Sequence, residues 1–204
     1  MTADELLDLG PVIPVVVLED AGAAVPLART LVDAGMRAIE ITLRTPAALE
    51  AIANVAADVP DAVVGAGTVL SPAQAQDALA AGAQFLVAPG STPALLDRLA
   101  GMPLLPGAVT ASEVMALLER GITWAKFFPA ESSGGVRALK ALAGPFPQMR
   151  FCPTGGIDAA KAKDYLALPN VACVGGSWML PPPAVQAGDW ERIRELATAP
   201  SSTA

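Results

Sequence analysis

The 204-residue sequence contains no histidine and only two cysteines. The absence of histidine removes the commonest general base and the commonest metal ligand, which leaves carboxylates, lysines, hydroxyls and backbone amides for any chemistry. Cys152 and Cys173 each lie in an apolar run typical of a strand, so we interpret them as buried small residues and not as a disulfide or a metal pair. We therefore expect neither a metal nor another cofactor.

Basic clusters and long apolar runs are also missing. The net charge is −7 and the sequence pI is about 4.5, which argues against nucleic acids and anionic membranes as partners. No apolar run approaches the roughly 18 residues of a transmembrane helix. The first residues are acidic where a signal peptide would be basic. We expect a soluble cytoplasmic protein, in which local groups can still bind an anionic small molecule.

Apolar runs typical of buried strands alternate with stretches typical of helices, eight times along the chain. The expected strands are 11–18, 36–44, 62–69, 84–89, 102–107, 121–130, 149–156 and 171–177. The expected helices are 3–9, 20–34, 46–57, 71–82, 92–100, 110–120, 134–143, 158–168 and 184–197. The composition shows no second class of sequence, which indicates one domain over residues 1–204.

Eight such units predict an α/β fold, a single-domain (β/α)8 TIM barrel with a short N-terminal helix. The alternative is an open doubly wound sheet, but its Gly-x-Gly-x-x-Gly signature is absent after the first strand. We expect residues 200–204 to form a disordered tail.

The second expected strand has two different faces. They are Ile39, Ile41 and Leu43 on one side, and Glu40, Thr42 and Arg44 on the other. Because the neighbouring strands are apolar throughout, the polar face is expected to point into a shared interior or the mouth of a barrel.

Lys126 lies within Ala125-Lys-Phe-Phe-Pro-Ala130, a run that is otherwise apolar. A buried ammonium is costly unless it is paired or gives up its proton. A desolvated amine is a nucleophile that attacks ketones to form a Schiff base. A lysine paired with a carboxylate, or one that reaches solvent at the strand end, is the structural alternative, and this run alone does not decide between them.

Chemistry in a barrel gathers at the carboxyl ends of the strands, and this rule collects residues from five strands. They are Glu40, Arg44, Thr68, Pro89, Lys126, Phe128 and Thr154. Two glycine pairs, Gly155-Gly156 and Gly175-Gly176 with Ser177 after it, follow the last two strands, where barrels commonly bind phosphate through backbone amides. Either pair alone can serve an ordinary turn, but together they predict a phosphate site.

Seven short segments occur in an order that chance would hardly reproduce. They are Ile39–Thr45, Gly65–Val69, Ala88–Gly90, Leu105–Thr110, Ala125–Ala130, Pro153–Ile157 and Val174–Trp178. In them the chain resembles, over nearly its whole length, the 2-keto-3-deoxy-6-phosphogluconate (KDPG) aldolases of the Entner–Doudoroff pathway. These enzymes are often bifunctional as 4-hydroxy-2-oxoglutarate (KHG) aldolases.

The resemblance implies a class I, metal-free lyase, usually a homotrimer, that cleaves KDPG to pyruvate and glyceraldehyde 3-phosphate. It implies Lys126 as the Schiff-base lysine and Glu40 as the proton shuttle, with Arg44 and Thr68 near the pyruvate carboxylate. A threonine in the place of Thr154 goes with the gluconate-derived substrate, whereas relatives that act on the galactonate-derived epimer tend to carry valine.

We expect the amides of Gly155, Gly156 and Gly176 to bind the substrate phosphate, with help from Ser177 and the helix start after the eighth strand. Structural alternatives remain for most of these residues. Glu40 and Arg44 could form an ion pair, Thr68 and Thr154 could be turn hydroxyls, and Pro89 and Phe128 could be wall residues.

Three other functions are alternatives to a KDPG aldolase. One is an aldolase for the galactonate epimer. Another is a different phosphate-binding barrel enzyme, such as a sugar-phosphate isomerase or a thiamine phosphate synthase. The last is a non-catalytic barrel that binds a phosphorylated acid. The last two would have no use for Lys126.

Overall fold

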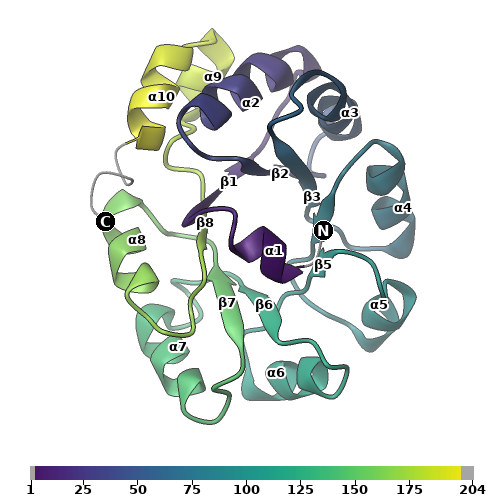
Figure 1. The fold of residues 1–204 in the computed structure, drawn as a ribbon, viewed down its shortest axis with the longest axis vertical. Helices are drawn as coiled ribbons and strands as arrows, with labels where there is room; N and C mark the ends of the chain where they lie inside the picture. Colours follow the sequence, from purple (N-terminus) through teal and green to yellow (C-terminus); the bar gives the residue numbers. More distant parts are fainter. Residues whose placement is uncertain (1–2, 199–204) are drawn as a thin grey trace.

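A computed structural model describes residues 3–198, so the tail expected at 200–204 lies outside the described residues. Parallel strands curl around a common interior, and most of the helices lie outside them (Figure 1). The strands are β1 (Val12–Val16), β2 (Ala38–Thr42), β3 (Val63–Gly67), β4 (Phe85–Val87), β5 (Leu104–Leu105), β6 (Trp124–Phe127), β7 (Arg150–Pro153) and β8 (Val174–Gly176). The helices are α1 (Ala3–Leu7), the 3-10 turn η1 (Ala21–Ala23), α2 (Ala24–Asp33), α3 (Ala48–Asp58), α4 (Pro72–Ala80), α5 (Pro93–Arg98), α6 (Ala111–Leu118), α7 (Gly135–Ala143), α8 (Ala159–Leu166), α9 (Pro182–Ala187) and α10 (Trp190–Thr198).

The sheet is parallel and comes in two parts, a six-stranded one in the order β5-β4-β3-β2-β1-β8 and the pair β6-β7. Backbone hydrogen bonds join the pair to its neighbours at both edges. On one side, Lys126 N donates to Pro106 O at 2.8 Å, and on the other Ala172 N donates to Phe151 O at 3.0 Å. A further parallel bridge links Thr154 and Gly175. The result is an α/β fold with a curled parallel sheet.

Each of the eight predicted strands contains an observed strand, but the single helix predicted over 184–197 is wrong. The structure has two helices there, α9 and α10. Gly188 ends α9 in the left-handed conformation, with φ +66°, which favours glycine. The carboxylate of Asp189 then accepts a hydrogen bond from Arg192 N at 3.1 Å and caps the start of α10.

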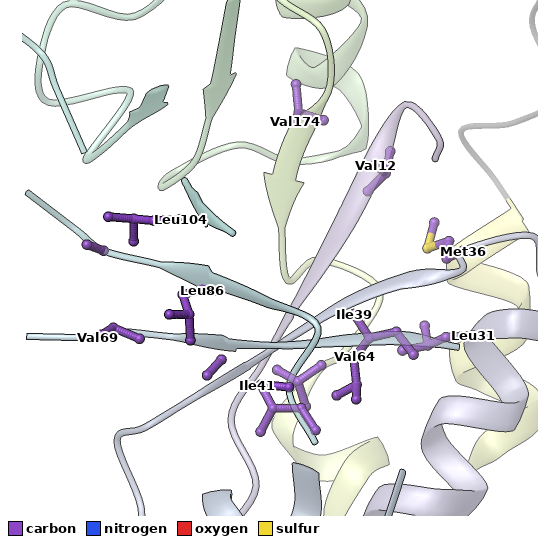
Figure 2. Close-up of a cluster of buried hydrophobic side chains, with 14 of the residues drawn as sticks. Val12, Leu31, Met36, Ile39, Ile41, Val64, Val69, Leu86, Leu104 and Val174 are labelled. Carbon is purple, nitrogen blue, oxygen red and sulfur yellow. The ribbon is translucent and has the colours of Figure 1, made fainter. Parts of the chain in front are cut away.

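Strand residues alternate between two apolar cores. The outer core lies between the strands and the surrounding helices, and Figure 2 shows Ile39, Ile41 and Val64 with Leu31 of α2 close to Ile39. The outward direction of Ile39 and Ile41 confirms the face predicted for them. Glu40, between them, is therefore on the inner face.

The inner core is covered at one end by α1, which lies across the space enclosed by the curled strands (Figure 1). Leu6 and Leu7 of α1 are each 1% exposed. They share a cluster with Ala38, Val63 and Phe85, which are the first residues of β2, β3 and β4. The helix thus covers the amino ends of the strands, and chemistry is left to the carboxyl ends.

Candidate active site

A buried ion pair joins β2 to β6. Lys126 Nζ lies 2.9 Å from Glu40 Oε1 and 3.1 Å from Oε2, although the two residues are 86 positions apart. Lys126 is 4% exposed and Glu40 is 3% exposed. The paired lysine that the sequence left as an alternative is thus what the structure contains. At 2.9 Å, the Glu40 carboxylate is also close enough to Lys126 Nζ to act as its general base.

The strand geometry explains why Lys126 is on the inside. Its neighbours Ala125 and Phe127 are 0% exposed and belong to the outer core, so the alternation of β6 turns the lysine inward. The Lys126 ammonium also lies 5.6 Å from the centroid of the Phe128 ring, within range of a cation–π interaction. Glu40 and Phe128 together compensate the cost of burying this charge.

Gly67, a residue that the sequence reasoning did not assign to the site, gives Glu40 its space. A Cβ atom at Gly67 would overlap the Glu40 carboxylate, and one at Gly65 would overlap the Phe85 ring. Both glycines are on the inner face of β3 and are two residues apart. The signal was present in the sequence as Gly65-Ala-Gly67, because alternate glycines on one strand leave one face bare.

Arg44 and Thr68 meet at the carboxyl ends of β2 and β3. Arg44 Nε donates a hydrogen bond of 3.0 Å to Thr68 Oγ1. Thr68 has φ +59°, a left-handed conformation that is uncommon for a threonine. Arg44 is exposed, and the ion pair that the sequence allowed between Glu40 and Arg44 is replaced by the pairs Glu40–Lys126 and Arg44–Thr68. The third polar residue of this face, Thr42, donates to Val16 O at 3.0 Å.

Pro89 and Phe128 form packed walls. A Cβ at Gly107 would overlap the Pro89 backbone, so the loops after β4 and β5 pack directly on each other. The Phe128 ring would lie 3.2 Å from a Cβ at Gly155, which places the ring over the turn after β7.

The turn after β7 contains two consecutive left-handed glycines, Gly155 with φ +102° and Gly156 with φ +77°. A side chain at either position would be strained. Just before them, Thr154 is 6% exposed, and its Oγ1 has no hydrogen-bond partner among the described residues. The Thr154–Gly175 bridge sets this turn beside the loop after β8.

Gly176 and Ser177 differ in accessibility. The Trp178 indole lies against Gly176, because a Cβ there would overlap the ring. Ser177 is exposed and lines a cavity of about 730 Å³ between the end of β1 and α9, and the Lys126–Glu40 pair lies outside that cavity. The helix start expected to assist after the eighth strand begins with Pro182 and Pro183, which have no N–H to donate.

A second polar cluster, which the sequence reasoning also missed, lies behind the Gly155-Gly156 turn. We call Glu131, Lys161 and Tyr165 the Glu131 cluster. Lys161 Nζ is 2.7 Å from Glu131 Oε2, and Tyr165 Oη donates to Glu131 Oε1 at 2.5 Å. Hydrogen bonds from Lys161 and Tyr165 lower the pKa of Glu131. Burial, and then the bond to Glu131, raise the pKa of Tyr165.

Among residues 3–198, no three histidine, cysteine, aspartate or glutamate side chains are grouped so that they could hold a metal ion. No helix in that range is long and apolar enough to cross a membrane. Cys152 and Cys173 are buried free thiols, as predicted. A hydrogen bond to Cys152, and then burial, raise the pKa of Cys173.

The fold and the ion pair define a class of protein, in which a curled parallel sheet holds a lysine and a carboxylate in a desolvated interior, as Schiff-base enzymes do. The chain belongs to the KDPG and KHG aldolase family, whose sequence profile matches residues 3–196. It is 52% identical over 198 residues to the KHG/KDPG aldolase of Escherichia coli strain K12, covering 96% of this chain and 93% of that protein.

Solved structures agree with this assignment. The KDPG aldolase of Legionella pneumophila, with pyruvate captured at low pH as a covalent carbinolamine intermediate, is similar with a TM-score of 0.95 and 45% identity, covering 98% of each chain. A structure described as native KDPGal is similar with a TM-score of 0.79 and 30% identity, covering 94% of this chain and 93% of the other. The family seen in the sequence segments is therefore confirmed.

Proposed function

We propose that this protein is a class I aldolase that cleaves KDPG to pyruvate and glyceraldehyde 3-phosphate, and KHG to pyruvate and glyoxylate. The observation that carries the proposal is the buried contact between Lys126 Nζ and Glu40, at 2.9 Å. A related family member holds pyruvate as a carbinolamine, the adduct that a lysine amine would form with a ketone.

In the first half of the reaction, Glu40 accepts a proton from the Lys126 ammonium, and the free amine attacks the C2 ketone. The carbinolamine forms as the amine nitrogen bonds to C2, Glu40 gives its proton to the carbonyl oxygen, and Glu40 then takes a second proton from the nitrogen. Glu40 then returns its proton to that hydroxyl, which leaves as water. The iminium left on Lys126 is the electron sink for the next step.

In the second half, Glu40 takes the proton of the C4 hydroxyl as the C3–C4 bond breaks. The electron pair of the C3–C4 bond moves into the iminium to give an enamine. Glyceraldehyde 3-phosphate leaves. Glu40 gives the proton to C3, and water hydrolyses the resulting iminium to release pyruvate and restore the Lys126 ammonium beside the Glu40 carboxylate. Glu40 thus carries out each proton transfer in the proposed mechanism. The absence of a side chain at Gly67 leaves space for its carboxylate.

Arg44 and Thr68 bind the substrate carboxylate in this proposal, because a guanidinium offers parallel donors that match a carboxylate. Pro89 and Phe128 shape the site, and Thr154 binds a substrate hydroxyl. The phosphate binds the amides of Gly155 and Gly156, with Gly176 and Ser177 beside them across the Thr154–Gly175 bridge. The gluconate epimer is favoured because the relatives named for KDPG are 45% and 52% identical, against 30% for KDPGal.

We further propose a closed (β/α)8 barrel with a short N-terminal helix, supported by the hydrogen bonds at both edges of β6-β7. The resemblance to the family supports a cytoplasmic homotrimer that uses neither metal nor cofactor. Light scattering on the purified protein measures the oligomer.

Borohydride trapping with pyruvate tests the proposed function. Reduction should fix a covalent adduct on the peptide that carries Lys126, and Lys126→Ala should lose both the adduct and the cleavage of KDPG. Lys140→Ala is the matched control, because Lys140 is an exposed lysine on α7. An adduct on a peptide without Lys126 would overturn the assignment.

Glu40→Gln separates the two roles. It keeps the size of the side chain but removes the base, so turnover should slow by roughly 10²-fold or more, while some trapping persists. Turnover at the parent rate would remove Glu40 from the mechanism.

A further inference from the structure

The Glu131 cluster connects the loop after β6 to α8. Lys161 and Tyr165 are four residues apart and therefore project from the same face of α8. Both reach the carboxylate of Glu131, which follows the strand that carries Lys126. Tyr165 is 1% exposed, so its hydroxyl is held in one place, whereas the side chain of Glu131 is 37% exposed.

The cluster also holds the carbonyl groups of the Gly155-Gly156 turn. Glu131 N donates to Gly155 O at 3.2 Å, and Lys161 Nζ donates to Gly156 O at 3.1 Å. One position earlier, Ala130 N donates to Thr154 O at 2.8 Å. The aliphatic part of Glu131 packs against the same turn, since a Cβ at Gly156 would lie 2.7 Å from its Cγ. Three consecutive carbonyls are thus anchored on one side.

Anchoring these carbonyls orients the amides. In a trans peptide the C=O and the following N–H point in opposite directions. The N–H groups of Gly155, Gly156 and Ile157 therefore point away from the anchoring groups. None of these amides donates to a carbonyl within residues 3–198. Successive free amides of this kind form a concave binding site for an anion.

The Glu131 carboxylate keeps Lys161 on the carbonyl side of the turn. A free lysine with several rotatable bonds would not hold Gly156 O, but a lysine bound at 2.7 Å to a carboxylate does. Tyr165 in turn fixes the carboxylate from the buried side. Lys161 therefore acts through the backbone of the turn and not as a direct ligand of the phosphate.

We propose that Glu131, with Lys161 and Tyr165, is a positioning group that presents the amides of Gly155, Gly156 and Ile157 to the substrate phosphate. This inference rests on the proposed function and deepens it. It predicts that damage to the cluster weakens recognition of phosphate and leaves the chemistry at Lys126 intact.

The test compares Tyr165→Phe, Lys161→Met and Glu131→Gln with the control Lys163→Met, an exposed lysine on the same helix. Losing one hydrogen bond to the carboxylate should raise KM for KDPG roughly 2- to 10-fold. The kcat/KM for KHG, which has no phosphate, and the rate of pyruvate trapping should stay within about 2-fold of the parent. Glu131→Ala should be worse than Glu131→Gln, which keeps the size and an acceptor.

Titration with inorganic phosphate provides a readout that needs no turnover. The Kd for phosphate should rise in the three cluster variants and not in Lys163→Met. Equal losses for KDPG, KHG and pyruvate trapping would mean a general structural role and overturn the inference. An unchanged KM and Kd would overturn it as well. If the parent protein shows no pyruvate adduct, the proposed function fails, and the phosphate titration still decides the role of the cluster.

Discussion

At the scale of single residues, Lys126 and Glu40 are two charged side chains whose burial is unfavourable in free energy. Replacing a buried ion pair with apolar residues is often neutral or stabilising, whereas removing one partner costs about 3–5 kcal/mol. An interior this apolar therefore has no structural need for the pair. The chemistry proposed for the two residues explains why they are kept together.

Gly67→Ala tests whether the space beside Glu40 matters. A methyl group there would overlap the Glu40 carboxylate and push it away from Lys126 Nζ. A displacement of about 1 Å is expected to lower kcat roughly 10²-fold. Steady-state kinetics on KDPG measure the effect. Gly144→Ala is the control, because a Cβ there meets no atom within 4 Å and its φ of −64° suits alanine. Equal activity of the two variants would contradict the prediction.

Thr154→Val tests the only hydroxyl that the proposal assigns to epimer choice. Its Oγ1 is buried without a partner in the described structure, so replacing it with a methyl group should leave the free energy of unfolding unchanged or slightly higher. If the hydroxyl binds the substrate, kcat/KM for the gluconate epimer should fall more than that for the galactonate epimer, by ~0.5 to 1.5 kcal/mol. An unchanged ratio between the two substrates would reduce Thr154 to a turn residue.

The contact between Lys126 and Glu40 in the candidate site was partly predictable from the sequence. Both residues drew attention because a charged side chain within an apolar strand is costly to bury unless it is paired. In the predicted barrel, the carboxyl ends of the strands would also lie close together. Gly67 and the Glu131 cluster were not predicted. Their meaning depends on which atoms face them across strands and loops far away in the sequence, and the alternation of one strand does not contain that information.

Local signals predicted most of the elements. Caps at Ser71, Thr92, Thr110 and Asp158 each precede a helix and each accept a hydrogen bond from its first turn. The split between α9 and α10 was missed because the local pattern did not show that Gly188 would become left-handed and Asp189 would start a new helix. Strands came out shorter than their apolar runs, because apolar residues continue into the buried loops.

At the scale of a single helix, the capping box of α6 predicts how the stability of the fold depends on pH. Burial raises the pKa of Glu113, but hydrogen bonds from Val109 N and from the hydroxyl and N–H of Thr110 outweigh it, so the pKa is lowered. A carboxyl with a lowered folded-state pKa stabilises the fold above its unfolded pKa, near 4.3, and loses this as the pH falls through the folded value. Glu113→Gln should reduce stability at pH 7 by on the order of 0.5 kcal/mol.

The measurement is urea unfolding of the parent and Glu113→Gln from pH 7 to pH 3. The difference between them should shrink as the pH falls. Glu119→Gln, at the other end of the helix, is the control. A difference that is constant with pH would mean that the charge of Glu113 has no part in the cap.

At the scale of the whole molecule, curvature creates the site. β2 is in the middle of the six-stranded sheet and β6 belongs to the separate pair, yet their side chains touch at 2.9 Å. A flat sheet would keep them far apart. The same curvature produces an inner core at the amino ends of the strands. Helix α1 lies over this core (Figure 1), and its Leu6 and Leu7 are part of the apolar cluster.

Leu7→Ala tests that packing. Leu7 is 1% exposed within the inner core, so the variant should lose about 2–5 kcal/mol of the free energy of unfolding through lost burial and a cavity. Because Leu7 is at the end of the strands opposite the loops that carry Arg44 and Gly155, kcat should stay close to the parent value below the unfolding transition. Leu70→Ala is the matched control, since Leu70 is 62% exposed and should change stability by no more than about 0.5 kcal/mol. Urea unfolding of all three proteins decides the question. If Leu7→Ala were no less stable than Leu70→Ala, the packing of α1 on the inner core would not contribute to the stability of the fold.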